Sequence, residues 1–307
     1  EPIVSTYRGY TIVGFPPPSS GGPHVAQMLN ILENFDLAKI HGEDPSAAQH
    51  VIAEAMKLAF ADRAYWLGDA DFVPVPRGLT DKNYARELAG KIQLDRAVTV
   101  KSHSQPPGWQ DNTFGKHTTH IAAADAEGTW VAITATVNTT FGSKVVVPGT
   151  GVVLNNEMDD FSAQPGAPNA FKLIGAENNA IAPGKRPLSS MSPTIVLKDG
   201  QPVFTVGAAG GPKIVTQVLL AFVLQIDFEM PLSEAVGAPR IHHQWQPDEL
   251  FYESKLDKEL QKGLASRGHQ LKELDSGGVT QAIRWLPKKR IFLGVHDPRV
   301  PGKAAGL

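Results

Sequence analysis

The chain has 307 residues, of which 42% are apolar and 20% are charged, and it contains no cysteine. This composition is that of a globular protein with one large core or two domains. A formal net charge of −2 provides no basic field for a nucleic acid, and the lack of cysteine excludes disulfides, thiolate metal sites and a cysteine nucleophile. The longest apolar run, residues 215–226, is too short to cross a membrane.

The first third of the chain is predicted to be mostly helical. Residues 1–15 alternate as a strand pair around Arg8 and Gly9, and a connector rich in Pro, Ser and Gly follows at 16–23. Apolar residues at helical spacing predict three helices, at residues 25–37, 45–66 and 80–92. Thr80 is the expected N-cap of the third helix.

The pattern changes from helical to sheet after an aperiodic stretch at 99–116, which is typical of an exposed linker suited to cleavage. Runs of β-favouring residues with turn signals between them predict three hairpins, with strands at 119–124 and 129–137, 194–197 and 203–206, and 281–286 and 290–295. Two more helices are expected, at 213–226 and 256–267. Elements in this order indicate a layered α+β or α/β fold.

Thr118 stands at the end of the linker and at the start of a predicted strand. A threonine hydroxyl is a poor nucleophile at neutral pH, but at a chain terminus its own α-amine can take the proton. A free α-amine has a pKa of about 7.7–8.0, which suits a base near neutrality. Taken alone, however, two threonines in a strand are more often explained by β-propensity.

Five separated motifs change that balance. They are Thr118-Thr119-His120, Asn138-Thr139-Thr140-Phe141-Gly142, Leu154-Asn155-Asn156-Glu157-Met158-Asp159-Asp160-Phe161, Lys185-Arg186-Pro187-Leu188-Ser189-Ser190-Met191-Ser192-Pro193 and Gly210-Gly211. In this order and spacing they resemble the bacterial γ-glutamyltransferases. The resemblance covers the family's small subunit at 118–307 and the C-terminal part of its large subunit at 1–117. It implies an N-terminal-nucleophile hydrolase with an αββα four-layer sandwich, in which both parts form one globular body.

The resemblance implies catalytic roles for four residues. Cleavage between His117 and Thr118 would free Thr118 as nucleophile and α-amine base, which would attack the γ-carbonyl of a donor such as glutathione. Thr136 matches the threonine that hydrogen-bonds the nucleophile's hydroxyl. Gly210 and Gly211 match the pair whose N–H groups form an oxyanion hole, and no cofactor is implied.

Further residues match the pocket for the γ-glutamyl group, whose α-ammonium and α-carboxylate require both signs of charge. Asn138, Glu157 and Asp160 match the ammonium site, and Ser189 and Ser190 match the carboxylate site. Phe171 stands where some bacterial members carry a gating tyrosine, which implies a lid without the hydroxyl. Without the resemblance, the acidic residues would be interpreted as a solvated turn and the serines as a capping turn.

One part of the family pattern is not found in this sequence. The family's carboxylate-binding arginine lies in the upstream part of the large subunit, and none of Arg8, Arg63, Arg77 and Arg186 occupies its place. The chain opens on Glu1-Pro2 without an initiator Met or a signal pattern, so we expect the upstream portion to be an obligate partner. A periplasmic or secreted location is implied by the family alone, and no membrane span or nucleic-acid partner is expected.

Several other readings stay open. His242-His243 could suggest a metal site, but neighbouring strand residues point to opposite faces, so packing is favoured. The serines and glycines at 19–22 could cradle an anion before a helix, although a connector is the simpler interpretation. A cephalosporin-acylase-like enzyme would use the same nucleophile on another acyl group. An unprocessed or truncated inactive chain would serve as a binding module.

Overall fold

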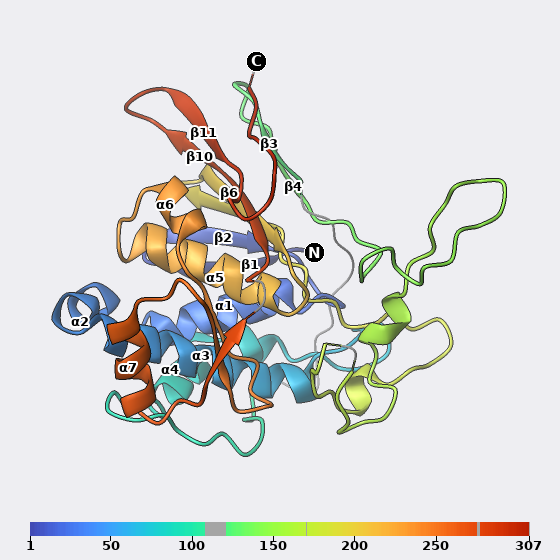
Figure 1. Cartoon of the computed structure of the whole chain (residues 1–307), viewed down its shortest axis with the longest axis horizontal. Helices are drawn as coiled ribbons and strands as arrows, with labels where there is room; N and C mark the ends of the chain where they lie inside the picture. The colour runs from blue at the N-terminus through green and yellow to red at the C-terminus, as the bar shows by residue number, and fades with distance from the viewer. Residues whose placement is uncertain (108–120, 170, 275–276, 307) are drawn as a thin grey trace.

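The computed structural model describes residues 1–107, 121–169, 171–274 and 277–306. Its central element is a six-stranded antiparallel sheet. The strands run in the order β1 (Ile3–Tyr7), β2 (Tyr10–Gly14), β5 (Thr194–Lys198), β6 (Gln201–Ala209), β10 (Val279–Leu286) and β11 (Ile291–Val295) (Figure 1). The strands therefore lie in chain order across the sheet, with the N-terminal pair at one edge and the C-terminal pair at the other.

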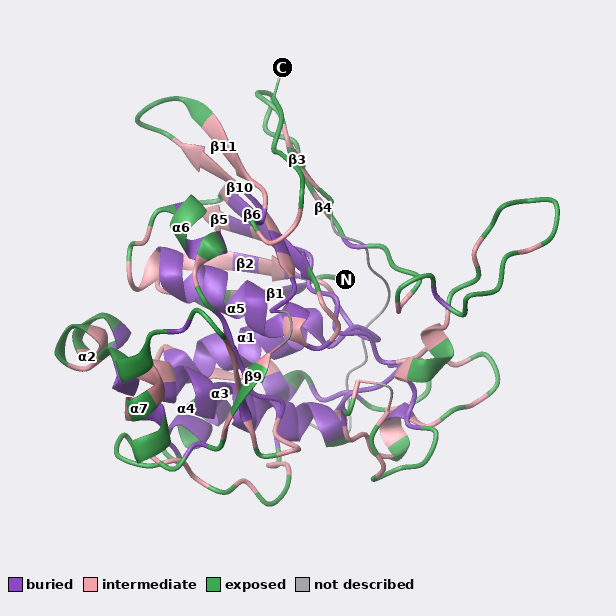
Figure 2. Cartoon of the chain, in the orientation of Figure 1, coloured by how far each residue is buried: buried purple, intermediate pink, exposed green. Residues whose placement is uncertain are grey.

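Helices pack against this sheet and supply most of the apolar interior. They are α1 (Gly21–Leu32), α2 (Leu37–Glu43), α3 (Pro45–Trp66), α4 (Lys82–Ala89), α5 (Lys213–Ile226), α6 (Leu232–Gly237) and α7 (Lys258–Ser266). One hydrophobic cluster joins the sheet to α1, α3 and α5, and it includes residues as far apart as Tyr7, Leu29, Met56 and Phe222. Figure 2 shows these three helices as almost wholly buried. Burial of this apolar surface provides the main driving force for the fold.

Several predicted elements are confirmed, namely the first strand pair, the hairpin at 194–206, the final hairpin and the helices at 45–66 and 213–226. The boundaries of the other helices were partly wrong. The first helix begins at Gly21 and ends at Leu32, because Asp36 starts α2 by accepting a hydrogen bond from the Lys39 N–H at 3.0 Å. The N-cap of α4 is Asp81 rather than Thr80.

The N-cap of α4 lies one residue after the predicted one, because the Asp81 carboxylate rather than the Thr80 hydroxyl accepts from the first N–H groups of the helix. Asp81 Oδ1 accepts from the N–H groups of Asn83 at 2.8 Å and Tyr84 at 2.9 Å. Thr80 lies in the 3-10 helix η1 (Arg77–Thr80), and its hydroxyl donates back to the Arg77 carbonyl. Two adjacent capping candidates cannot be ranked by pattern alone.

A two-stranded sheet covers the side of the large sheet that the helices leave open. It consists of β3 (Ile121–Ala124) and β4 (Trp130–Ile133), and the predicted second strand ends four residues early. This hairpin lies against β5, β6 and β10 without joining their ladder. Because α5 packs on β6 and β10 as well, the hairpin and that helix must cover opposite faces.

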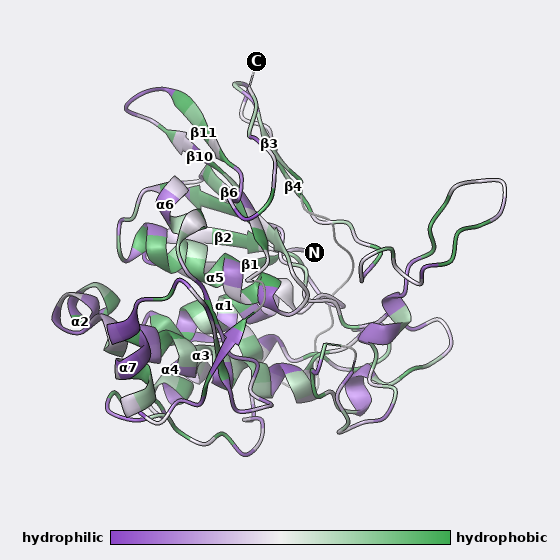
Figure 3. Cartoon of the chain, viewed as in Figure 1, coloured by the Kyte–Doolittle hydropathy of each residue, from purple (hydrophilic) through white to green (hydrophobic). Residues whose placement is uncertain are grey.

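The hairpin and the chain that follows it carry apolar side chains on the outside. Exposed apolar residues of this part are Ile121, Val131, Ile133, Val137, Phe141, Val145, Val146, Val152, Leu154 and Met158. Figure 3 shows apolar stretches along the hairpin and along the long loop beyond it. An apolar surface of this extent is typical of an interface rather than of a face in contact with water.

Residues 134–191 contain little regular structure. Two short 3-10 helices, η2 (Glu157–Asp160) and η3 (Glu177–Asn179), punctuate a path of turns that extends away from the main body (Figure 1). A smaller sheet of β7 (Ile241–His242), β8 (Leu250–Glu253) and β9 (Leu271–Leu274) lies near the end of α5 closest to this segment. The two meet at the site described below.

No helix in the described part of the chain combines the length and the apolar composition that a membrane crossing requires.

Candidate active site

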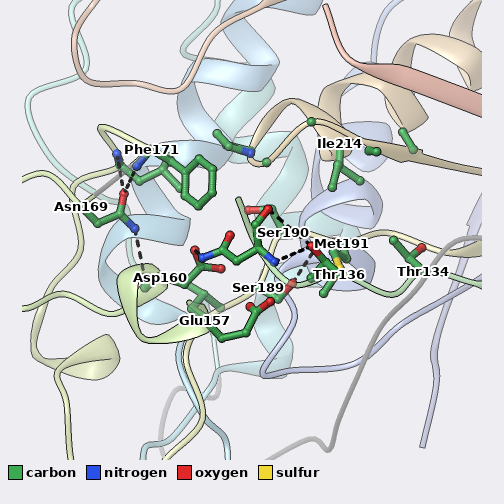
Figure 4. A pocket seen from close by; sticks show the side chains of 18 of the residues that line it. Thr134, Thr136, Glu157, Asp160, Asn169, Phe171, Ser189, Ser190, Met191 and Ile214 are labelled. Atoms are coloured by element: carbon green, nitrogen blue, oxygen red, sulfur yellow. Dashed lines mark hydrogen bonds between the residues drawn. The ribbon is translucent and has the colours of Figure 1, made fainter. Parts of the chain in front are cut away.

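A cavity of about 120 Å³, here called the inner cavity, lies where β6 ends and the irregular segment meets α3 (Figure 4). Its lining includes nine residues that the sequence singled out, Thr136, Asn138, Glu157, Asp160, Phe171, Ser189, Ser190, Gly210 and Gly211. It also includes Arg63, Thr134 and Asn169, to which the sequence analysis gave no role in the site. Segments separated by well over a hundred residues therefore converge on one space.

Two asparagines hold the acidic end of the inner cavity together. Asn138 has a φ of 75°, in the left-handed region that asparagine adopts more readily than most residues. Its Nδ2 donates to Asp160 Oδ1 at 3.1 Å and to the Asn156 carbonyl at 3.0 Å. Asn156 Oδ1 in turn accepts from the N–H and the hydroxyl of Thr139, both at 3.0 Å. The loop after β4 and helix η2 are thereby fixed to each other.

The two carboxyl groups at this end have pKa values well above those of exposed carboxyl groups. Burial, and then the charge of Asp160, raise the pKa of Glu157 to about 7. Burial also raises the pKa of Asp160 to about 6, against the hydrogen bond from Asn138 and the charge of Arg63, which lower it. Glu157 Oε1 is buried and has no hydrogen-bond partner in the described part of the chain. A buried acceptor left without a donor costs about 1–3 kcal/mol, so this end is suited to receive a cationic donor group.

Ser189 and Ser190 form another part of the lining, and Ser189 is hydrogen-bonded to the stretch at 16–23. The Ser189 N–H donates to the Pro18 carbonyl at 3.0 Å, and its carbonyl accepts from the N–H of Ser20 at 2.8 Å and from the Ser20 hydroxyl at 2.9 Å. The stretch at 16–23 thus does more than connect two elements. It positions the serine wall of the inner cavity.

Arg63 stands behind that wall, although the sequence analysis gave it no role in the site. It lies on α3, is 4% exposed, and donates from Nη2 to Ser190 Oγ at 3.0 Å and from Nε to Ser20 Oγ at 3.2 Å. Burial lowers its pKa to about 10, and the nearby Asp160 raises it, so the guanidinium stays charged at neutral pH. An arginine within an otherwise alanine-rich, apolar helix face was the signal that could have identified it.

The remaining arginines that the sequence considered are engaged elsewhere. Arg8 pairs with Asp227 at 3.0 Å, and Arg186 pairs with Asp69. Neither residue lines the inner cavity. Arg77 lies in η1, outside the cavity lining.

Gly210 and Gly211 form the turn between β6 and α5. Their φ values of 142° and 62° fall in the region that favours glycine. A Cβ on Gly211 would lie 2.9 Å from Phe171 Cδ1, and one on Gly210 would lie 3.1 Å from Gln217 Nε2. Neither position has room for a side chain, so the backbone itself faces the cavity.

Phe171 closes the inner cavity over Gly211, and its loop is held on two sides. Asn169 Oδ1 accepts from the N–H groups of Phe171 at 3.0 Å and Leu173 at 3.1 Å, while its Nδ2 donates to the Asp160 carbonyl at 3.3 Å. Gln244 Nε2 donates to the Phe171 carbonyl at 3.4 Å. The Phe171 ring, labelled in Figure 4, lies beside Gly211, and whether it acts as a lid stays a prediction.

Two threonine hydroxyls face the inner cavity from the chain that follows β4. Thr136 Oγ1 accepts from the Asn138 N–H at 2.8 Å and lies 3.5 Å from the Asn138 carbonyl, to which it can donate. The Thr134 hydroxyl is buried and has no hydrogen-bond partner among the residues that the structure describes. The predicted nucleophile Thr118 and the residue before it, His117, lie outside the described residues.

One group of side chains in the described ranges has the composition of a metal site. His50, Glu54 and His269 place possible ligand atoms within 4.8 Å of one another, on the buried side of α3. His50 Nε2 meets the Gln93 carbonyl at 2.7 Å and must donate to it, so His50 Nδ1 accepts from His269 Nε2 at 2.7 Å. Lys57 Nζ pairs with Glu54 Oε1 at 2.8 Å, so the Glu54 carboxylate already has a cationic partner. The group is a hydrogen-bonded network, and we assign it a structural role.

His242 and His243 have separate environments. His242 Nδ1 lies 3.0 Å from Thr216 Oγ1, whereas His243 Nε2 lies 3.1 Å from Asp248 Oδ1. Both are buried, and neither belongs to the possible metal group. Packing is therefore the role that their contacts support.

The arrangement as a whole can hold a small zwitterion. The lining of the inner cavity contains two carboxyl groups, and two hydroxyls of which one, on Ser190, accepts from a buried guanidinium. The backbone of the glycine turn lies beside both. Such a site can orient an amino-acid group while leaving its side chain pointed at the turn.

Comparison with known proteins places this site in a family. The gamma-glutamyltranspeptidase family profile matches residues 1–307. The glutathione hydrolase proenzyme of Escherichia coli is 46% identical over 299 residues, which is 97% of this chain and 51% of that protein. The chain spans about half the length of the curated relatives that it matches.

Solved structures agree with the sequence match. A variant of Helicobacter pylori gamma-glutamyltranspeptidase is 46% identical with a TM-score of 0.58, over 59% of this chain and 100% of that chain. Cephalosporin acylase from Bacillus halodurans is 28% identical with a TM-score of 0.83, over 99% of this chain and 52% of that chain. The fold is thus the mixed α and β fold of the N-terminal-nucleophile hydrolases. The chain belongs to the gamma-glutamyltranspeptidase family.

Proposed function

We propose that the mature protein transfers γ-glutamyl groups from donors such as glutathione to water or to the amine of an amino acid or peptide. The observation that carries this proposal is the two-signed inner cavity. Glu157 and Asp160 would hold the α-ammonium of the γ-glutamyl group, and Ser189 and Ser190, backed by Arg63, would hold its α-carboxylate. Two relatives, from Escherichia coli and a Pseudomonas species, are named glutathione hydrolase proenzymes, which supports the same reaction.

The chemistry follows from cleavage of the His117–Thr118 bond. The freed α-amine of Thr118 takes the hydroxyl proton while Oγ attacks the γ-carbonyl carbon of the donor. The oxyanion accepts hydrogen bonds from the N–H groups of Gly210 and Gly211. One such donor typically stabilises the transition state by about 2.7–4 kcal/mol. The C–N bond then breaks, the leaving amine takes the proton, and an ester on Thr118 remains.

Deacylation repeats these steps with a new nucleophile. Water or an acceptor amine attacks the ester carbonyl carbon and gives its proton to the α-amine. The bond from carbon to Thr118 Oγ breaks, and the proton returns to that oxygen. Thr136, whose hydroxyl proton makes only a long contact of 3.5 Å with the Asn138 carbonyl among the described residues, would hydrogen-bond the nucleophile.

We further propose that the site is completed by a large-subunit region like the one that makes up the other half of the relatives' length. The apolar surface of the β3–β4 hairpin and the long loop after it supports such a partner. That region would also supply the family's carboxylate-binding arginine. Export to the periplasm or the medium belongs to the same proposal.

Maturation is tested by gel electrophoresis and N-terminal sequencing of the chain expressed together with the region that its longer relatives carry. A species that begins at Thr118 is expected. Thr118→Ala should abolish both the cleavage and the turnover of a γ-glutamyl anilide, whereas Thr129→Ala, in the exposed β3–β4 turn, should retain both. An uncut chain would instead support an inactive binding module, and turnover by Thr118→Ala would show that the nucleophile lies elsewhere.

The acylase alternative is supported by the similarity to the Bacillus halodurans enzyme. An acylase and a γ-glutamyltransferase can be distinguished by the acyl group that each prefers in a substrate. A glutaryl anilide has the same chain as a γ-glutamyl anilide but lacks the α-ammonium. Losing charge-assisted hydrogen bonds worth about 1.5–3 kcal/mol should lower kcat/KM roughly 10- to 100-fold for the glutaryl compound. Equal or faster turnover of the glutaryl anilide would favour the acylase.

A further inference from the structure

A second cavity, here called the sheet-end cavity, lies at the end of the large sheet that is remote from the glycine turn. It has a volume of about 170 Å³ and is lined by residues of β2, β5, β6, β10 and the last turn of α5. Strand β6 begins beside this cavity and runs to the glycine turn, and α5 runs back from that turn to the cavity. Among the described residues, none lines both this cavity and the inner cavity.

The lining of the sheet-end cavity is mainly apolar and aromatic. Val196 and Phe204 are buried, whereas Tyr10 and Trp285 are partly exposed. The Trp285 ring packs against Phe292, with 4.8 Å between the ring centres, so its position is supported from outside the cavity. An apolar cavity of about 150 Å³ binds benzene in another protein, so a space of this size admits a single aromatic ring.

Two cationic side chains, Lys198 and Arg284, join this apolar lining. In the described part of the chain, their printed contacts are with neutral groups. Lys198 Nζ donates to the Gly9 carbonyl at 3.0 Å and lies 4.6 Å from the centre of the Tyr10 ring. Arg284 Nη1 donates to Gln225 Oε1, which leaves other N–H groups of the guanidinium for a ligand.

The described lining contains no Asp or Glu that would neutralise these cations. Asp227, which follows the last residue of α5, is bound elsewhere, because it accepts from the Tyr7 hydroxyl at 2.6 Å and from Arg8 Nε at 3.0 Å. Asp199, next to Lys198 in the β5–β6 turn, is exposed. Two cations beside an apolar surface favour a ligand that carries an anionic group on an apolar body.

We propose that the sheet-end cavity binds a small carboxylic acid with an aromatic ring. The ring would pack against Phe204 and Trp285, and the carboxylate would be held by Arg284 and Lys198. Arg284 is the main anchor, because a guanidinium can bind a carboxylate through two parallel hydrogen bonds, whereas an ammonium acts as a point charge. The site goes beyond γ-glutamyl transfer and does not depend on it, since the two cavities lie at opposite ends of β6 and α5.

The test uses the protein expressed with the region that its longer relatives carry, and it compares benzoate with benzamide, which has the same ring without the charge. Saturation-transfer NMR titrations measure both dissociation constants. Benzoate should bind more tightly than benzamide. Arg284→Gln should weaken benzoate binding about 10-fold and Lys198→Gln about 3-fold, as expected for a bidentate contact and for a partly exposed point charge.

Lys289→Gln, on the exposed turn between β10 and β11, removes a cation outside the lining and is the matched control, which should bind benzoate unchanged. Arg284→Lys keeps the charge and should lose less affinity than Arg284→Gln, which separates the loss of charge from the loss of the Gln225 contact. Saturable binding that only the Arg284 and Lys198 variants weaken supports the site. No saturable binding of benzoate, equal affinities for benzoate and benzamide, or equal affinities in all variants would overturn it.

Discussion

The two walls of the inner cavity are built in different ways. The buried wall, formed by Arg63, Ser189 and Ser190, is held by α3 and by the N–H and the hydroxyl of Ser20. The exposed wall, formed by Thr136, Asn138, Glu157 and Asp160, belongs to a segment with almost no regular structure.

Because of this difference, changes in the buried wall should alter the stability of the fold, whereas changes in the exposed wall should alter ligand binding and its pH dependence. On the buried wall, the polar groups satisfy one another, and a change there should be felt by the whole fold. On the exposed wall, the carboxyl groups have raised pKa values, and one oxygen lacks a partner within the described residues. That wall gains its missing contacts only when a ligand arrives, so changes there should affect binding first. The following predictions test this division.

The largest expected effect is on the buried wall. Arg63→Met should lower the free energy of unfolding by about 3 kcal/mol, because it leaves the Ser20 and Ser190 hydroxyls and the Asp160 carboxyl without their buried cation. Urea denaturation measures this loss. Arg63→Lys keeps the charge and should lose less. A loss below about 1 kcal/mol for Arg63→Met would mean that this wall does not depend on the guanidinium.

A smaller effect, on binding rather than folding, is expected for the exposed wall. Asp160→Asn should raise the KM of a γ-glutamyl donor about 10- to 100-fold, which corresponds to a charged hydrogen bond of roughly 1.5–3 kcal/mol. Unfolding should change little, because asparagine keeps an oxygen for Asn138 Nδ2. Asp159→Asn is the matched control, since Asp159 lies outside the cavity lining. Equal KM values in both variants would contradict the ammonium site.

The smallest effect is a pH dependence that runs in opposite directions for binding and stability. As pH falls from 8 to 5.5, first Glu157, with a pKa of about 7, and then Asp160, with a pKa of about 6, become neutral. The donor ammonium loses its partners, so KM should rise several-fold below pH 7. In Glu157→Gln the upper step should disappear while the lower one remains.

Stability should follow the reverse course. Both carboxyl groups bind protons more tightly in the folded chain than in the unfolded chain, so their contribution to the free energy of unfolding is fully present below about pH 4, the pKa range of an unfolded carboxyl group, and is lost as pH rises through the folded pKa values of about 6 and about 7. Thermal unfolding at several pH values, with Glu157→Gln as the comparison, measures this contribution. A stability that rises with pH and flattens in that variant would contradict the raised pKa of Glu157.

Local patterns determined the regular elements of this protein. The apolar period fixed α3 and α5, and alternation with turn residues fixed the strand pairs of the large sheet. The same patterns placed the Thr80 cap and the end of α1 wrongly, because neighbouring polar residues compete for the same N–H groups within one turn. The residues of the inner cavity were identified from the order of the family motifs, since no periodicity relates Asn138 to Ser189 or Gly210.

Only the tertiary structure could decide which side chains share a space and at what charge. Arg63 is one residue in an ordinary helix until Ser20 and Ser190 are brought to it from 43 and 127 residues away. The raised pKa values of Glu157 and Asp160 depend on burial, which no local pattern encodes for a loop. Sequence therefore determined the elements and the chemistry available to them, because these depend on near neighbours. Folding alone determined the two walls of the inner cavity, because both arise from contacts between distant segments.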